Sequence, residues 1–101
     1  MAMTPEAAVK AKVKKMLDLW GAYYFMPPAN GYGRAGIPDI VGCHNGKFFA
    51  IECKAGKGKT TALQDRELTR IQEAGGGAIV VNETNLPDVH KLLEKLNERT
   101  D

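Results

Sequence analysis

The stretch "GIPDIVGCHNGKFFAIECKAG", residues 36–56, decides the fold because it encodes two strands and the turn between them. Residues 38–44 and 47–54 are both rich in the β-branched, aromatic and other apolar side chains that strands favour. Asn45 and Gly46 alone separate the two runs. An Asn-Gly pair in this position is the strongest short-range signal for a hairpin closed by a two-residue type I′ turn. The stretch therefore predicts an antiparallel strand pair with a defined register.

The register of this hairpin places three charged side chains on one face. With a two-residue loop, His44 pairs with Lys47, and the same alignment sets Asp39 directly opposite Glu52. Side chains alternate along a strand, so Lys54 projects to the same face as Glu52. Like charges directly opposite each other destabilise a sheet unless a cation lies between them. The sequence thus predicts two carboxylates and an ammonium where a strand core would carry apolar residues.

A divalent metal ion would explain the two acids. Carboxylate oxygens from Asp39 and Glu52, with the main-chain carbonyl of Cys53, form a hard-oxygen site of the kind that suits Mg²⁺, which keeps several waters. A bound metal can lower the pKa of one water, neutralise phosphate charge and orient an in-line attack. Lys54 could orient the attacking water or stabilise developing negative charge.

The alternative is a surface salt-bridge cluster of Asp39, Glu52 and Lys54, which is common on antiparallel ribbons and contributes little stability. In the flanking segments "IVG" and "FFAI", the side chains that point to either face of the strand are apolar, which indicates central strands covered on both faces. Burying an unpaired charge is costly, so these flanks favour a site with a chemical role over a solvated cluster.

Local signals predict the remaining elements of one α/β domain over residues 1–101. Thr4 is a good N-cap and Pro5 a good first helical residue. Apolar periodicity, glycine and proline then set the other boundaries. The predicted elements are a helix over 5–20, a short strand over 22–26, a loop over 27–36, a basic loop over 55–59, a helix from about 63 to 74, a buried strand over 78–82 and a last helix over 86–98.

Length and composition limit the class of protein. A chain of 101 residues with 44% hydrophobic residues builds one modest core, and a net charge of +2 does not by itself indicate a polyanionic partner. The two cysteines lack metal-ligand spacing and indicate neither a disulfide framework nor a structural zinc site. With no apolar run of roughly 20 residues and no secretory signal, we expect a cytoplasmic protein without membrane contact.

Ile37-Pro38-Asp39 and Glu52-Cys53-Lys54 together resemble the PD-(D/E)xK nuclease signature. The segments "GRAGIPDIVG", "NGKFFAIECKAG", "TTALQDREL" and "AGGGAIVV" resemble, in order and spacing, the VRR-NUC (virus-type replication-repair nuclease) family over residues 4 to 83. The chain is most similar to the stand-alone phage and bacterial forms. The resemblance implies a restriction-endonuclease-like core of helix, three-stranded antiparallel meander, helix and strand, to which this chain adds a C-terminal helix.

The resemblance also implies the activity: Mg²⁺- or Mn²⁺-dependent hydrolysis of phosphodiester bonds in branched DNA by a homodimer that resembles a Holliday junction resolvase. Such an enzyme would serve DNA repair, recombination or phage replication in a bacterial cell or phage-infected host. Carried over by position, Asp39 and Glu52 would be the metal ligands and Lys54 the catalytic lysine. Glu6 would be the acidic residue of the first helix, and Gln64 the glutamine of the second.

Two of these assignments have local alternatives. An acid such as Glu6 in the first turn of a helix is favoured by the helix dipole in any case. Thr61-x-x-Gln64 also fits a capping box, in which the glutamine side chain serves the helix terminus. Both residues therefore have a structural and a catalytic interpretation.

Basic residues near the acids are candidates for DNA contact. Arg34 lies in the loop just before the acidic strand, where a guanidinium can clamp a phosphate. Lys57 and Lys59 either contact the nucleic-acid backbone or are solvated loop residues. The same alternatives, a solvated face or a phosphate-facing patch, apply to the lysines of the first helix, which are Lys10, Lys12, Lys14 and Lys15.

A non-catalytic DNA-binding or scaffold module with a retained nuclease fold is the competing functional class. The presence of Asp39, Glu52 and Lys54 together argues against it, because a protein released from catalysis has no reason to cluster three charges across a hairpin. A sequence-specific restriction enzyme is disfavoured because a chain of 101 residues leaves no room for a base-reading domain.

Overall fold

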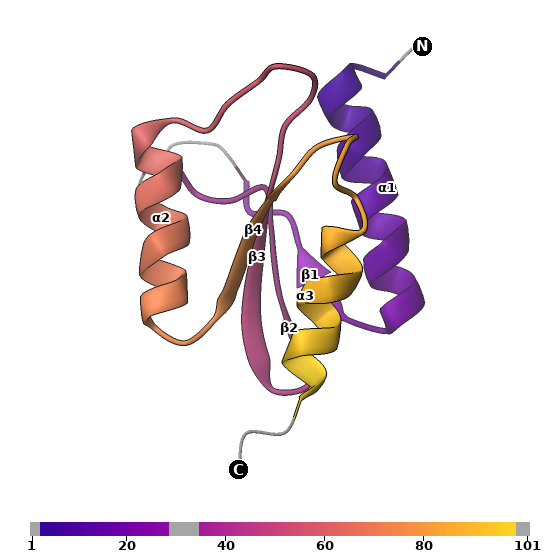
Figure 1. Cartoon of the computed structure of the whole chain (residues 1–101), viewed down its shortest axis with the longest axis vertical. Helices are drawn as coiled ribbons and strands as arrows, with labels where there is room; N and C mark the ends of the chain where they lie inside the picture. Colours follow the sequence, from indigo (N-terminus) through magenta and orange to yellow (C-terminus); the bar gives the residue numbers. More distant parts are fainter. Residues whose placement is uncertain (1–2, 29–34, 99–101) are drawn as a thin grey trace.

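The fold is a four-stranded sheet with helices on both of its faces, in a computed structural model that describes residues 3–28 and 35–98 (Figure 1). The strands lie in the order β1-β2-β3-β4; β1, β2 and β3 are antiparallel neighbours, and β4 runs parallel to β3. The expected α/β core with an extra C-terminal helix is confirmed. The elements are α1 (Pro5–Trp20), β1 (Tyr23–Phe25), β2 (Ile40–His44), β3 (Lys47–Cys53), α2 (Ala62–Glu73), β4 (Gly77–Val81) and α3 (Asp88–Asn97).

The hairpin register is the predicted one. His44 pairs with Lys47, and the ladder continues to its last pair, Ile40 with Ile51. The turn residues Asn45 and Gly46 have φ of 54° and 77°, the left-handed values that a type I′ turn requires. The Asn-Gly pair therefore sets the alignment of the two central strands.

The acidic end of β2 differs from the prediction, because the strand begins at Ile40 and not at residue 38. Pro38 has no N–H to donate to a ladder. The N–H of Asp39 donates to a side-chain oxygen of Glu52 at 3.2 Å and so is not available to the main chain of β3. The main-chain ladder ends one pair before the two acids.

The two faces of the sheet are packed differently. Helices α1 and α3 cover one face, where Phe49 and Ile51 of β3 meet Leu17 and Leu93 in the main core. Helix α2 covers the other face through a smaller cluster built around Leu68. Because side chains alternate along β3, Glu52 lies on the α2 face. Among the described residues no helix is long and apolar enough to cross a membrane.

Part of the α2 face is not covered. Tyr23 and Phe25 of β1 and Phe48 of β3 lie on this face, and their exposed fractions are 69%, 49% and 47%. Together these three exposed aromatic side chains give this face an apolar surface. We call them the aromatic patch.

The opposite edge of the sheet is blocked by side chains. On β4, the Ala78 carbonyl accepts a hydrogen bond from Gln72 Nε2 and the Val80 carbonyl accepts one from Asn85 Nδ2, both at 3.0 Å. Satisfying edge carbonyls in this way discourages another strand from adding at β4.

Candidate active site

Glu52 is the centre of the site. It lies on β3 beneath the start of α2, and only 2% of its surface is exposed. The ammonium of Lys54, two residues later on the same face, is 3.6 Å from Glu52 Oε2, and the Lys54 side chain is 15% exposed. The alternation along β3 thus brings together the acid and the lysine as the sequence predicts.

Asp39 and Glu52 are joined through main-chain amides. The N–H of Asp39 donates to Glu52 Oε1 at 3.2 Å, and the N–H of Cys53 donates to Asp39 Oδ2 at 2.9 Å. The two carboxylates therefore take over the cross-strand hydrogen bonding where the main-chain ladder stops. Each acid is held in place by the strand opposite to its own.

Gln64 contacts both the helix terminus and Glu52. Its Oε1 accepts a hydrogen bond from the Thr61 N–H at 2.9 Å, which completes a capping box at the start of α2. Its Nε2 donates to Glu52 Oε2 at 3.0 Å. The structural and the site interpretation of Gln64 apply together, since one amide group serves the helix with its oxygen and the acid with its nitrogen.

A glycine fixes the loop that carries Asp39 against α2. Gly36 has φ of +85°, a conformation that L side chains rarely adopt. A Cβ on Gly36 would lie 2.5 Å from the main-chain carbon and oxygen of Leu63 and 2.9 Å from the nitrogen of Gln64. This close approach holds the loop of Asp39 and the helix of Gln64 on either side of Glu52.

Lys10 is a member of the site that the sequence did not single out. Its ammonium is 3.7 Å from Asp39 Oδ1, and its side chain is 34% exposed. The sequence treats the four lysines of α1 alike, although Lys10 is one helical turn after Glu6 and next to the buried Val9. That position at the border of the buried stripe is the signal that could have distinguished it.

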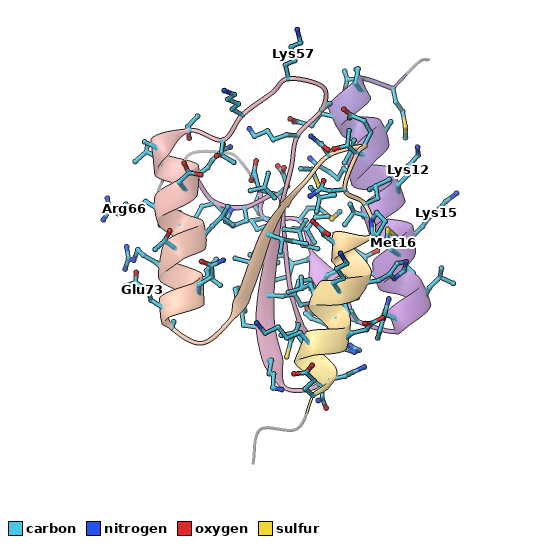
Figure 2. The ribbon with its side chains drawn as sticks, in the orientation of Figure 1. Lys12, Lys15, Met16, Lys57, Arg66 and Glu73 are labelled. Atoms are coloured by element: carbon cyan, nitrogen blue, oxygen red, sulfur yellow. The ribbon has the colours of Figure 1, made fainter. Side chains whose placement is uncertain are left out.

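A hollow of about 410 Å³ opens beside Lys54 and contains two of the other predicted residues. Glu6, from the first turn of α1, and Lys59, from the loop after β3, both line it. Lys57 projects away from the protein at the tip of that loop (Figure 2). Arg34 falls outside the described residues. The structure thus brings Lys59 close to the site and directs Lys57 into solvent.

A larger hollow of about 710 Å³ lies elsewhere, between the α2–β4 turn and α3. Of its lysines, Lys47 donates to the Leu96 and Glu98 carbonyls at 3.0 and 2.7 Å, and Lys91 lies 3.7 Å from Asp88. Lys47 thus binds the C-terminal end of α3, and Lys91 pairs with an acid in its first turn. The titratable cluster at Glu52 is the better candidate for chemistry, although the hollow beside its Lys54 is smaller.

Burial and charge determine the electrostatics of the site. Burial, reinforced by the neighbouring charge of Asp39, raises the pKa of Glu52 to about 7, and Lys54 opposes this rise. Burial raises the pKa of the Cys53 thiol to about 12, and the Cys53 side chain is buried in the main core, on the face of β3 opposite to Glu52. Only the main-chain carbonyl of Cys53 remains as a possible ligand.

The donor set fits a hard cation that needs few protein ligands. Asp39 and Glu52 supply carboxylate oxygens, and among the described residues no group of three or more His, Cys, Asp or Glu side chains is placed to enclose an ion. Mg²⁺ is characteristically held by one or two carboxylates, with waters and substrate phosphates filling the other positions. The residues present suit such an ion.

Comparison with known proteins identifies the family. Residues 8–81 match the archaeal Holliday junction resolvase (Hjc) family, and this range contains Lys10, Asp39, Glu52, Lys54 and Gln64. The chain is also 39% identical over 69 residues to "Putative nuclease p44" of Acyrthosiphon pisum secondary endosymbiont phage 1, a match that covers 67% of this chain and 70% of that protein. The chain therefore belongs to the archaeal Holliday junction resolvase family.

Proposed function

We propose that this protein is a metal-dependent endonuclease that hydrolyses phosphodiester bonds in branched DNA, in the manner of a Holliday junction resolvase. The observation that carries the proposal is the fixed pair of Asp39 and Glu52 with the Lys54 ammonium 3.6 Å from Glu52. Family membership supports the DNA substrate. The competing class, a non-catalytic DNA-binding module, gives no reason to maintain a buried acid in this arrangement.

The residues have separate roles in the proposed reaction. Asp39, Glu52 and the Cys53 carbonyl would hold Mg²⁺, or Mn²⁺ in its place, which when bound lowers the pKa of water and neutralises phosphate charge. Lys54 would orient the attacking water and stabilise the negative charge that develops on the phosphate oxygens. Gln64 holds Oε2 of Glu52 in a fixed orientation, since its own side chain is fixed by Thr61.

The hollow beside Lys54 supplies a path for the DNA backbone. Lys59 on one wall would contact a phosphate next to the scissile one, and Lys57 would reach further along the strand. Arg34 would contribute from the loop before Asp39. We propose that Glu6 acts at the edge of this hollow, because it lines the same space as Lys54.

We also propose that the protein acts as a homodimer. A four-way junction requires two coordinated cuts, and this domain contains one site, so a symmetric pair supplies the second. The aromatic patch of Tyr23, Phe25 and Phe48 supports this, because a second copy would remove these side chains from water. The blocked edge at β4 favours association at the β1 side of the sheet.

Within these nucleases we place the chain with the VRR-NUC proteins. The support is the order of its sequence segments, from the loop before Asp39 to the strand after the glycine triplet. The two acids and α2 lie within residues 8–81, the range that matches the archaeal Holliday junction resolvase family.

The test is a cleavage assay with three labelled substrates, a four-way junction, a flap and a linear duplex, each with and without Mg²⁺ or Mn²⁺. We expect cutting of branched DNA that needs the metal and is lost in Lys54→Ala and Asp39→Asn. Binding of junctions without metal-dependent cutting would overturn the enzymatic proposal and favour the scaffold alternative. Cutting that survives both substitutions would instead overturn the assignment of the site.

A further inference from the structure

Every carboxylate oxygen of the site has a nitrogen partner. For Asp39, Oδ2 accepts from the Cys53 N–H and Oδ1 lies 3.7 Å from the Lys10 ammonium. For Glu52, Oε1 accepts from the Asp39 N–H, and Oε2 accepts from Gln64 Nε2 and lies 3.6 Å from the Lys54 ammonium. Glu52 Oε2 has two such partners, and a cation at Asp39 Oδ1 would lie close to the positive charge of the Lys10 ammonium and compete with it.

Lys10 is the partner that is easiest to replace. Two of the others are main-chain amides fixed by the sheet, and Gln64 is fixed by its capping box. Lys54 is 15% exposed, whereas Lys10 is 34% exposed and reaches Asp39 from a separate helix. Its 3.7 Å separation from Asp39 is an ion-pair contact and is longer than a hydrogen bond.

We propose that Lys10 is a positioning residue that competes with the divalent cation for Oδ1 of Asp39. This inference rests on the metal-dependent function proposed above. Lys10 neutralises Asp39 beside the buried Glu52, which stabilises the fold. With a cation bound at Asp39, Lys10 would no longer be needed as the neutralising charge, and its flexible side chain would move away toward solvent.

Competition predicts opposite effects of removing Lys10 on stability and on metal affinity. Without the ammonium, two adjacent carboxylates lose one of their cations, so the protein in EDTA becomes less stable. The same loss leaves Oδ1 of Asp39 open to the metal. In the variant, binding of the metal does not have to break the partly exposed Lys10–Asp39 ion pair. We therefore expect Mn²⁺ to bind about three- to five-fold more tightly. Replacing a residue that has a purely structural role would not raise the affinity for the metal.

The experiment is a calorimetric titration of the whole protein with Mn²⁺, without DNA, together with melting temperatures in EDTA and in Mn²⁺. Lys10→Met keeps the length of the side chain, and Lys10→Gln serves as a second neutral variant. The matched control is Lys12→Met, which removes the same charge from the same helix at a side chain that projects away from the protein (Figure 2). We expect tighter Mn²⁺ binding, a lower melting temperature in EDTA and a larger rise with Mn²⁺ in both Lys10 variants, and none of these in the control.

The outcomes separate this inference from the proposed function. If the unaltered protein binds Mn²⁺ through Asp39 but the Lys10 variants bind it no more tightly, competition is wrong and the metal site stands. Equal tightening in Lys12→Met would reduce the effect to net charge and would also overturn the inference. If the unaltered protein and Asp39→Asn give the same titration, no metal binds at Asp39, and metal dependence through this site falls together with the inference.

Discussion

The two ends of the β2–β3 hairpin use the same strands in opposite ways. At the turn, the main chain pairs fully, and Lys47 and Asn45 donate to carbonyls at the end of α3. At the open end, the ladder stops, and the carboxylates of Asp39 and Glu52 take its place among ammonium groups. The turn end contributes register and stability, and the open end uses that register to hold charges together. In this small domain, the proposed active site lies where regular pairing ends.

The largest expected effect is the difference in cleavage rate between variants of Lys54 and Lys47, which lie at opposite ends of the hairpin. Lys54→Ala should lower the single-turnover rate of junction cleavage by about 10²–10³-fold, because the charge that develops on the phosphate loses its stabilising partner. Lys47→Ala should keep the cleavage rate and lower the free energy of unfolding by about 1 kcal/mol, since it removes hydrogen bonds to α3. Rates and urea unfolding curves of both variants give the comparison. A loss of cleavage in Lys47→Ala at full folding would contradict the division between the ends.

A second comparison uses one glycine from each end. Gly36→Ala should lower the free energy of unfolding by about 2–3 kcal/mol, because its φ is positive and its Cβ would overlap the main chain of Leu63. Gly46→Ala should cost about 1 kcal/mol, because its φ is positive but no atom lies within 4 Å of the added Cβ. Denaturant unfolding measures both. Equal losses in the two variants would show that the contact between the Asp39 loop and α2 contributes nothing to the free energy of unfolding.

The remaining comparison concerns pH. The pKa of Glu52 is about 7 in the folded protein against an ordinary value of 4.5, so the folded state keeps a proton that the unfolded state releases. The protein in EDTA should therefore lose stability as the pH rises from about 4.5 to about 7 and change little above that range. Glu52→Gln should remove this slope, and Lys47→Ala should retain it. Unfolding curves between pH 5 and 8 provide the measurement, and an unchanged slope in Glu52→Gln would assign it to another group.

Most of the fold could be predicted because its signals are local. The Asn45-Gly46 pair predicts the turn and the register of β2 and β3, and Thr4 and Thr61 mark the starts of two helices. The prediction fails at the beginning of β2, where the N–H of Asp39 bonds to a side chain instead of a strand. Such a hydrogen bond depends on a residue of another strand, so no local pattern contains it.

The site was predictable where one strand fixes the geometry and not where separate elements meet. Alternation along β3 predicts that Glu52 and Lys54 share a face. The border of the buried stripe of α1 could have distinguished Lys10 from the other lysines, but its pairing with Asp39 depends on how that helix lies against the sheet. For Gln64, the capping box is a local pattern, but its hydrogen bond to Glu52 depends on the packing of α2 onto β3.

The double contact of Gln64 restricts how this position can change in descendants of the protein. A capping box accepts glutamine or glutamate equally well, so the helix alone would tolerate Gln64→Glu, a change that needs a single base substitution. The acid Glu52 would not, because glutamate would direct a third carboxylate at Oε2, where the amide now donates at 3.0 Å. We therefore expect selection against Gln64→Glu although the substitution is neutral for folding. The first turn of α2 is constrained by the proposed active site as well as by the helix.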